Sequence, residues 1–237
     1  MRLSNSLIIG TAAIICTALI SFTISDTVQQ VQQQQRTVVV KGLAEREVAA
    51  DTAIWPLPIV HAANDPTEIY RNLANDMAAI KAFLRENGFS DAEMTVSAPA
   101  VFDKAAARYS DYDERKDFRY SGQQTLTVYT EKVEMVRTVR QQLSQLGQQG
   151  VALGGSEYEH AVEYHFNGLN SIKPSMIEES AANARAVALR FAEHSDSQLG
   201  KIARAQQGQF SISDRDSNTP HLKIVRVVST VAYQLVD

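Results

Sequence analysis

The sequence predicts an α+β fold in which a largely antiparallel sheet carries about three packed helices, preceded by one N-terminal transmembrane helix. Three observations lead to this prediction. Short β-branched or alternating runs occur in pairs, the first two pairs are each followed by a helical pattern, and an uncharged run stands near the amino terminus. The expected order is ββα–ββα–β–α–ββ, because hairpins interrupted by helices favour antiparallel pairing with helices packed on the sheet.

The predicted membrane helix runs from Leu7 to Ile24, eighteen residues without a charge. As a helix it would extend about 27 Å, close to the ~30 Å hydrocarbon thickness of a bilayer. Arg2 precedes the run and Asp26 is the first charge after it, so the positive-inside rule leaves the amino terminus in the cytoplasm. We expect a single-pass protein of the inner (cytoplasmic) membrane, anchored in the lipid bilayer by residues 1–25, with a periplasmic or otherwise extracytoplasmic C-terminal domain.

Two other interpretations of residues 1–25 stay open. One is a cleaved signal peptide, although the apolar region of such a peptide is usually shorter and the small-x-small sites beginning at Ser21 and Thr23 are poor. The other is a lipoprotein signal ending at Cys16, although Ile15 is not the small residue that such a signal has before its cysteine. Each of the three interpretations exports the rest of the chain.

Residues 26–36 form a glutamine-rich tether with too little apolar content to be buried, and residues 37–237 are predicted to form one domain. Its first strand covers 37–40, a turn covers 42–47, and a second strand covers 53–60. Pro56 and Pro58 lack an N–H group, so this second strand is expected at an edge or with a bulge.

The first helix of the domain is predicted to begin at Asp65, which can cap it, and to end at Asn87-Gly88. The remaining elements follow in chain order: a strand at 94–102, a polar loop at 104–117, a strand at 118–129, a helix at 131–146, one or two strands at 151–166, an alanine-rich helix at 172–194, and strands at 201–212 and 222–236.

One predicted strand carries candidate metal ligands. Alternation along SEYEHAVEYHF places Glu157, Glu159, Glu163 and His165 on one face. Three carboxylates and an imidazole are suitable ligands for a divalent ion. The alternative is an ordinary solvated face, which antiparallel sheets commonly have opposite an apolar one. The apolar face here comprises Tyr158, Val162, Tyr164 and Phe166.

A second acidic stretch resembles the start of a calcium loop. Asp214, Asp216 and Asn218 have the required spacing, but Thr219 and Val225 stand where such a loop has Gly and Glu. We therefore predict a turn in which the Asp and Asn side chains cap their own backbone.

The sequence lacks the motifs that are typical of several function classes. No nucleophile elbow, SxxK motif or phosphate-binding loop is present, and the single cysteine lies in the predicted membrane helix. A net charge of −4 without a basic stripe argues against nucleic-acid binding. We assign no catalytic residue and no cofactor, and we expect the protein not to be an enzyme.

An ordered series of segments resembles the SIMPL (DUF541) domain from Thr37 to Val236. The segments are VVVKGLAEREVAADTA, AFLRENGFSDAEMTVS, GQQTLTVYTEKVE, EESAANARAVALRFAEHS with LGKI after it, and VRVVSTVAYQLV. Two more, QQGQFSISDRDSNTP and YHFNGLNSIKPSMIEE, are similar to a membrane-anchored bacterial subgroup. The chain departs from the family at Gly42-Leu43-Ala44, where members often have Gly-x-Gly, and at Ala50, where members often have Pro.

The resemblance implies a bacterial envelope location, ring- or cage-like homo-oligomers in some members, and an association with oxidative-stress tolerance. It implies no catalytic residues. We expect a non-enzymatic, membrane-anchored envelope protein that self-assembles through its exported domain. The alternative is a metal-binding protein or metal-dependent enzyme that uses the strand face from Glu157 to His165.

Overall fold

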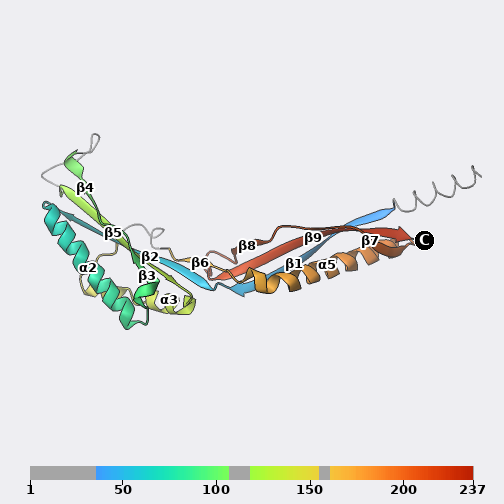
Figure 1. Cartoon of the computed structure of the whole chain (residues 1–237), viewed down its shortest axis with the longest axis horizontal. Coiled ribbons are helices and arrows are strands. Elements are labelled where there is room, and N and C mark those ends of the chain that lie inside the picture. Colours follow the sequence, from blue (N-terminus) through green and yellow to red (C-terminus); the bar gives the residue numbers. More distant parts are fainter. Residues whose placement is uncertain (1–35, 107–117, 155–160, 237) are drawn as a thin grey trace, which may run out of the picture. The chain divides into compact units, whose positions relative to one another are not determined.

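The computed structural model describes residues 36–106, 118–154 and 161–236, which form two compact units (Figure 1). Unit 1 contains residues 36–46, 171–211 and 225–236, and unit 2 contains Glu47–Asn170 and Ile212–Ile224. The boundary between the units falls inside two long strands, β1 (Thr37–Ala49) and β9 (Leu222–Val236). Each unit has its own buried apolar cluster, so each is described by itself.

Unit 2 is an antiparallel sheet with a helix packed along it. Its elements are β2 (Thr52–Ala63), α2 (Pro66–Glu86), the 3-10 helix η1 (Asp91–Glu93), β3 (Met94–Val96), β4 (Ala100–Asp103), the 3-10 helix η2 (Lys104–Ala106), β5 (Tyr120–Thr130), α3 (Val133–Arg140), α4 (Ser144–Gln148) and β6 (Glu163–His165). The strand order is β3–β5–β2–β6, with β4 also paired to β5. Trp55 and Leu57 lie opposite Val128 and Leu126, and these four residues are fully buried in the same cluster as the apolar face of α2.

The predicted signals of the first helix are confirmed at both ends of α2. The Asp65 carboxylate accepts a hydrogen bond from the Thr67 N–H at 2.8 Å, and Pro66 occupies the first helical position. At the other end Asn87 is the C-cap, and Gly88 has a φ of 90°. Glycine adopts this conformation without a steric penalty because it has no Cβ. Gly88 therefore allows the chain to turn sharply at the end of the helix.

The two prolines of β2 lie beyond its short pairing with β6, on the side of the strand turned away from β5. β6 pairs only with residues 52–54 of β2. Beyond that stretch the Pro58 carbonyl accepts a hydrogen bond from the Gly154 N–H at 2.9 Å, so the backbone of Pro58 faces away from β5. Pro56, two residues earlier, has the same orientation. Neither proline therefore removes a donor from the β2–β5 ladder.

Unit 1 is a thin layer of strands with one helix on it. The strands run in the order β1–β9–β7, and β8 (Ser211–Asp214), most of which belongs to unit 2, also pairs with β9. Helix α5 (Leu169–His194) lies along β1 and β9 in Figure 1, and β7 (Gln198–Gln207) forms an antiparallel pair with β9. The buried stripe of α5 repeats every four residues and consists of Met176, Ser180, Ala184, Ala188 and Ala192.

The alanine stripe allows α5 to approach the sheet closely at Gly42. A Cβ built on Gly42 would lie 1.9 Å from the Ser180 carbonyl oxygen and 2.4 Å from the Ala184 nitrogen. The predicted turn at 42–47 is therefore wrong, because β1 continues through these residues and Gly42 provides room for the helix. The chain turns at Asp51, whose carboxylate accepts hydrogen bonds from the N–H groups of Asn167 and Gly168, immediately before α5.

Several predicted strands and one predicted helix are interrupted, and the strands form two sheets where one was predicted. The expected strand at 94–102 divides into β3 and β4, with Pro99 between them, and the expected helix at 131–146 divides into α3 and α4. The expected strand at 201–212 divides into β7 and β8, and Gly208 lies between them. The α+β class, the antiparallel pairing and three of the helices (α2, α3 and α5) agree with the prediction.

The predicted membrane helix, the glutamine-rich tether and most of the polar loop at 104–117 lie outside the described residues. Among the helices that the structure does describe, none combines the length and the apolar character needed to cross a membrane.

Candidate functional site

The predicted metal-binding face is described only in part. Glu157 and Glu159 lie outside the described residues, whereas Glu163 and His165 flank Tyr164 in β6. The two outward side chains are exposed, and a Glu163 carboxylate oxygen lies 3.5 Å from Nε2 of His165. Within the described ranges no three His, Cys, Asp or Glu side chains are grouped closely enough to hold an ion. A metal site here stays a prediction, which elemental analysis of the purified protein checks.

In the described residues of this segment the alternation is as predicted, and the inward-facing Tyr164 belongs to a different site. Val162 and Tyr164 are buried, while Glu163 and His165 face solvent. Burial raises the pKa of the Tyr164 hydroxyl, and the nearby positive charges of Arg140 and Arg137 partly oppose this rise. Tyr164 is therefore an inward-facing polar group close to two guanidinium groups.

Tyr164 lines a cavity of about 360 Å³ within unit 2, which we call the basic pocket. Its walls come from the C-terminal end of α3, from β6 and from the segment that leads into β9. The lining residues are Arg137, Arg140, Gln141, Tyr164, Asn218, Pro220 and His221. The rings of Tyr164 and His221 meet edge to face, with centroids 6.1 Å apart.

The segment that supplies Asn218 and His221 is held by its own side chains. One carboxylate oxygen of Asp216 accepts hydrogen bonds from the N–H groups of Asn218 and Thr219, both at 2.8 Å, and the other accepts one from the Thr219 hydroxyl. The predicted self-capped turn is thus confirmed for Asp216 alone, because Asp214 pairs with Lys223 instead and the Asn218 side chain makes no hydrogen bond among the described residues. The hydrogen bonds from Thr219 and then Arg215 lower the pKa of Asp216 to about 2, so this turn keeps its charge in mild acid.

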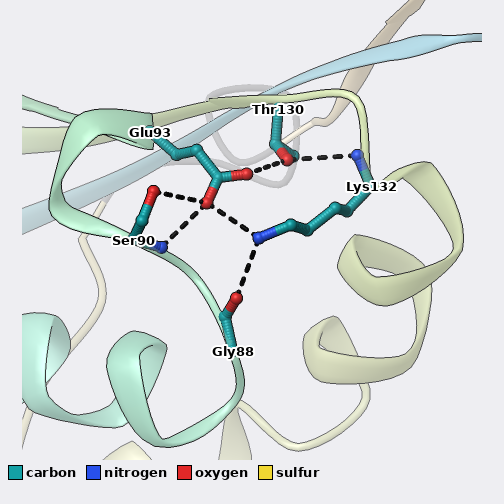
Figure 2. A network of polar contacts seen from close by, with 5 residues as sticks. All are labelled: Gly88, Ser90, Glu93, Thr130 and Lys132. Carbon is teal, nitrogen blue, oxygen red and sulfur yellow. Dashed lines mark hydrogen bonds and ion pairs between the residues drawn. The ribbon is translucent and has the colours of Figure 1, made fainter.

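A second polar network fixes the start of α3 (Figure 2). Its centre is Glu93, whose carboxylate accepts hydrogen bonds from the Ser90 N–H (2.8 Å), the Ser90 hydroxyl (2.9 Å), the Thr130 hydroxyl and the Lys132 ammonium (3.0 Å). Burial of this carboxyl raises its pKa, but the four hydrogen bonds outweigh that effect and lower the pKa from its ordinary 4.5 to about 2. Lys132 also donates to the Gly88 carbonyl at 3.0 Å, so the network ties the end of α2 to the beginning of α3. We interpret this network around Glu93 as an element of stability and not as a functional site.

Replacing Glu93 with glutamine is expected to lower the free energy of unfolding by about 2 kcal/mol at neutral pH, because the charge that four donors stabilise is lost. The pKa of Glu93 is lower in the folded state than its ordinary 4.5. Its contribution is therefore complete above that value and is lost as the pH falls toward 2. Urea unfolding at a series of pH values should show the difference between wild type and Glu93→Gln shrinking in acid. Glu86→Gln, an exposed change at the end of α2, should stay close to wild type throughout.

The sheet of unit 1 exposes apolar side chains on the face turned away from α5. Val40, Gly42 and Ala44 of β1 are buried toward the helix, whereas Val39 and Leu43, which alternate with them, are 65% and 41% exposed. On the same outer face β9 presents half-buried or exposed residues, namely Val228, Thr230, Ala232 and Val236. We call this surface the outer sheet face.

Strand β7 adds an exposed edge to unit 1. Nearly all of its ten residues are exposed, and it lies at the end of the strand order β1–β9–β7. Its pairing with β9 is irregular around Ile202, where the register shifts. An edge strand of this kind presents backbone N–H and C=O groups that another strand can pair with.

Comparison with known protein families decides the membership of the chain. Residues 38–227 match the SIMPL family, which is described as "Protein of unknown function (DUF541)". The chain belongs to the SIMPL family. The match covers most of both units, in agreement with the resemblance seen in the ordered segments. No curated protein matches this SIMPL chain.

The basic pocket of this SIMPL protein was not found from its sequence. Arg137, Arg140 and Gln141 come from a helix that looked like any amphipathic surface helix, and Asn218 and His221 come from a turn about eighty residues later. Of the lining residues of the basic pocket, only Tyr164 belonged to a face predicted from the sequence, the apolar face of the strand at 151–166. No local spacing connects these segments, so only the fold brings them together.

Proposed function

We propose that this SIMPL protein is a non-enzymatic component of the bacterial envelope, anchored by its amino-terminal segment and self-assembling through unit 1. The observation that carries the proposal is the outer sheet face, where Val39 and Leu43 stand exposed beside the half-buried residues of β9. Protein interfaces combine apolar side chains with polar ones. On this face Lys41 lies between Val39 and Leu43 on β1, and Glu45 and Arg226 are further charged residues.

The small core of unit 1 supports a second copy as the partner. Its cluster of mutually packed buried apolar residues has five members, two of them alanines. Small units with such limited cores often gain stability by oligomerisation. The β7 edge adds a symmetric route, because an edge strand can pair with its own copy around a twofold axis.

The sequence from Leu7 to Ile24 supports the anchored location in the inner membrane. Anchoring would also favour assembly, since confinement to one membrane raises the effective concentration of each copy. A reporter fused to the carboxyl terminus should be active only outside the cytoplasm. Activity only inside the cytosol would remove both the location and the envelope role.

The family resemblance extends the proposal to envelope or oxidative-stress tolerance. Because the single cysteine lies in the predicted membrane helix, thiol chemistry is not the means we propose. A deletion strain should lose viability under peroxide, and an assembly-defective variant should fail to restore it.

The assembly itself is tested by light scattering of the detergent-extracted, full-length protein. We expect the wild type to exceed the monomer mass at micromolar concentration. Val39→Lys should shift the protein toward the monomer, because a charge in the centre of an interface must be desolvated on association. Tyr70→Lys, an equally drastic change at an exposed residue of α2 in unit 2, should leave the mass unchanged. A strictly monomeric wild type contradicts the assembly proposal.

A further inference from the structure

We propose that the basic pocket of unit 2 binds a small organic oxyanion, a carboxylate or a phosphate ester. The inference goes beyond the proposed assembly, because the pocket lies entirely within unit 2 and uses none of the residues of the outer sheet face. Its basis is a cavity lined by Arg140 and by polar side chains that make no ion pair or hydrogen bond with other residues that the structure describes.

Arg140 is the central cation of this pocket. Arg137, one helical turn earlier, is already paired with Glu134 at 2.6 Å between Nη1 and Oε2. No carboxylate among the described residues pairs with Arg140. A guanidinium offers a planar fork of N–H donors that matches a carboxylate or a phosphate in two parallel hydrogen bonds. The charge therefore remains available to a ligand.

The other lining groups complete a set of donors around Arg140. The side chains of Gln141 and Asn218 and the ring of His221 make no hydrogen bond within the described part of the chain, yet all three line the cavity. The Tyr164 hydroxyl lies near the same guanidinium groups, as the effect of Arg140 on its pKa shows. Each of these groups can donate to an oxyanion.

Two features of the pocket oppose an anion, and both are smaller than the favourable charge. Glu134 neutralises Arg137, and the C-terminal end of α3 carries the negative end of the helix dipole. The dipole of an eight-residue helix amounts to a partial charge, and the C-cap N–H of Gln141 already bonds the carbonyls of Thr138 and Val139. A net positive charge therefore remains at Arg140.

The size and the walls of the pocket define the ligand class. A volume of about 360 Å³ is at the lower end of small-molecule sites. Pro220 and the edge-to-face rings of Tyr164 and His221 give an apolar wall beside the donors. The Asp216 turn fixes the backbone at Asn218 before any ligand arrives, so this part of the pocket needs little ordering on binding. We infer an oxyanion on a short organic body rather than a polymer.

The test uses full-length protein in detergent with inorganic phosphate and acetate as probes, at constant ionic strength maintained with chloride. The first readout is the melting temperature, which a ligand of the folded state raises in a saturable manner. The second is the NMR spectrum of protein labelled in its five histidines, in which the His221 resonance is identified by its loss in His221→Gln. We expect the His221 resonance to shift with at least one probe, while that of His194 in unit 1 stays in place.

Arg140→Gln should weaken this binding by about tenfold or more, because it removes the charged donor. The matched control is Arg71→Gln, which removes an exposed arginine from helix α2 of the same unit and should bind as wild type does. Binding of phosphate alone would identify a phosphate site, and binding of both probes would identify a general oxyanion site. If neither probe moves the His221 resonance, or if Arg140→Gln binds as wild type does, the proposal is overturned.

Discussion

Replacing Gly42 with alanine is expected to detach α5 from the sheet of unit 1 and to cost about 3 kcal/mol of stability. The added methyl group would lie 1.9 Å from the Ser180 carbonyl oxygen and 2.4 Å from the Ala184 nitrogen. Both are backbone atoms of the helix, so no side-chain rotation can relieve the clash. The helix itself must shift, which also breaks the buried hydrogen bond between the Ser180 and Ser229 hydroxyls at 2.6 Å.

Hydrogen exchange locates the effect of Gly42→Ala within the chain. The amides of α5 should lose protection, while those of α2 in unit 2 keep it. Gly147→Ala is the control, since a Cβ at that position meets nothing within 4 Å and alanine is the better residue in a helix. Equal stability of Gly42→Ala and wild type would refute the close approach of α5 to β1.

Replacing Trp55 with alanine is expected to destabilise unit 2 by about 3–5 kcal/mol, because it leaves a large cavity in the core. The indole is fully buried and meets the ring of Phe89 edge to face at 6.3 Å. It lies in β2 opposite Val128, at the centre of the cluster that α2 covers. Chemical denaturation followed by circular dichroism measures the loss.

Trp55→Phe should cost clearly less than Trp55→Ala. The indole N–H is buried and has no acceptor among the described residues, so replacing it removes an unsatisfied donor while most of the ring volume stays. Phe102→Ala, at a side chain 57% exposed, should change the stability by less than about 0.5 kcal/mol. An equal loss in Trp55→Phe and Trp55→Ala would contradict the expectation that the aromatic ring in this core position preserves most of the stability.

Local chemistry explains where the fold could be predicted. Asp65 and Pro66 act within one helical turn, so the start of α2 was readable from the sequence. Pro56 and Pro58 likewise carry their own restriction to an open edge. The sequence predicts a turn at Gly42 because a glycine commonly indicates a turn. Nothing in the neighbouring residues shows that a helix from a distant part of the chain packs against this position. Only the packing of Ser180 and Ala184 against it gives that glycine its meaning.

The candidate sites follow the same rule. The outward face of Glu163 and His165 was predicted because alternation in a strand is local. The basic pocket needs three segments brought together by the fold, and Arg140 is indistinguishable in sequence from any solvated arginine. The turn around Asp216 was predicted because its hydrogen bonds stay within three residues, but its place beside α3 was not.

The position of β9 has a consequence for how the protein is made. The last fifteen described residues form the middle strand between β1 and β7. During synthesis neither β1 nor β7 can pair with its neighbour until residues 222–236 have been made, so unit 1 cannot close before then. Loss of β9 would therefore leave both outer strands of unit 1 without their shared neighbour.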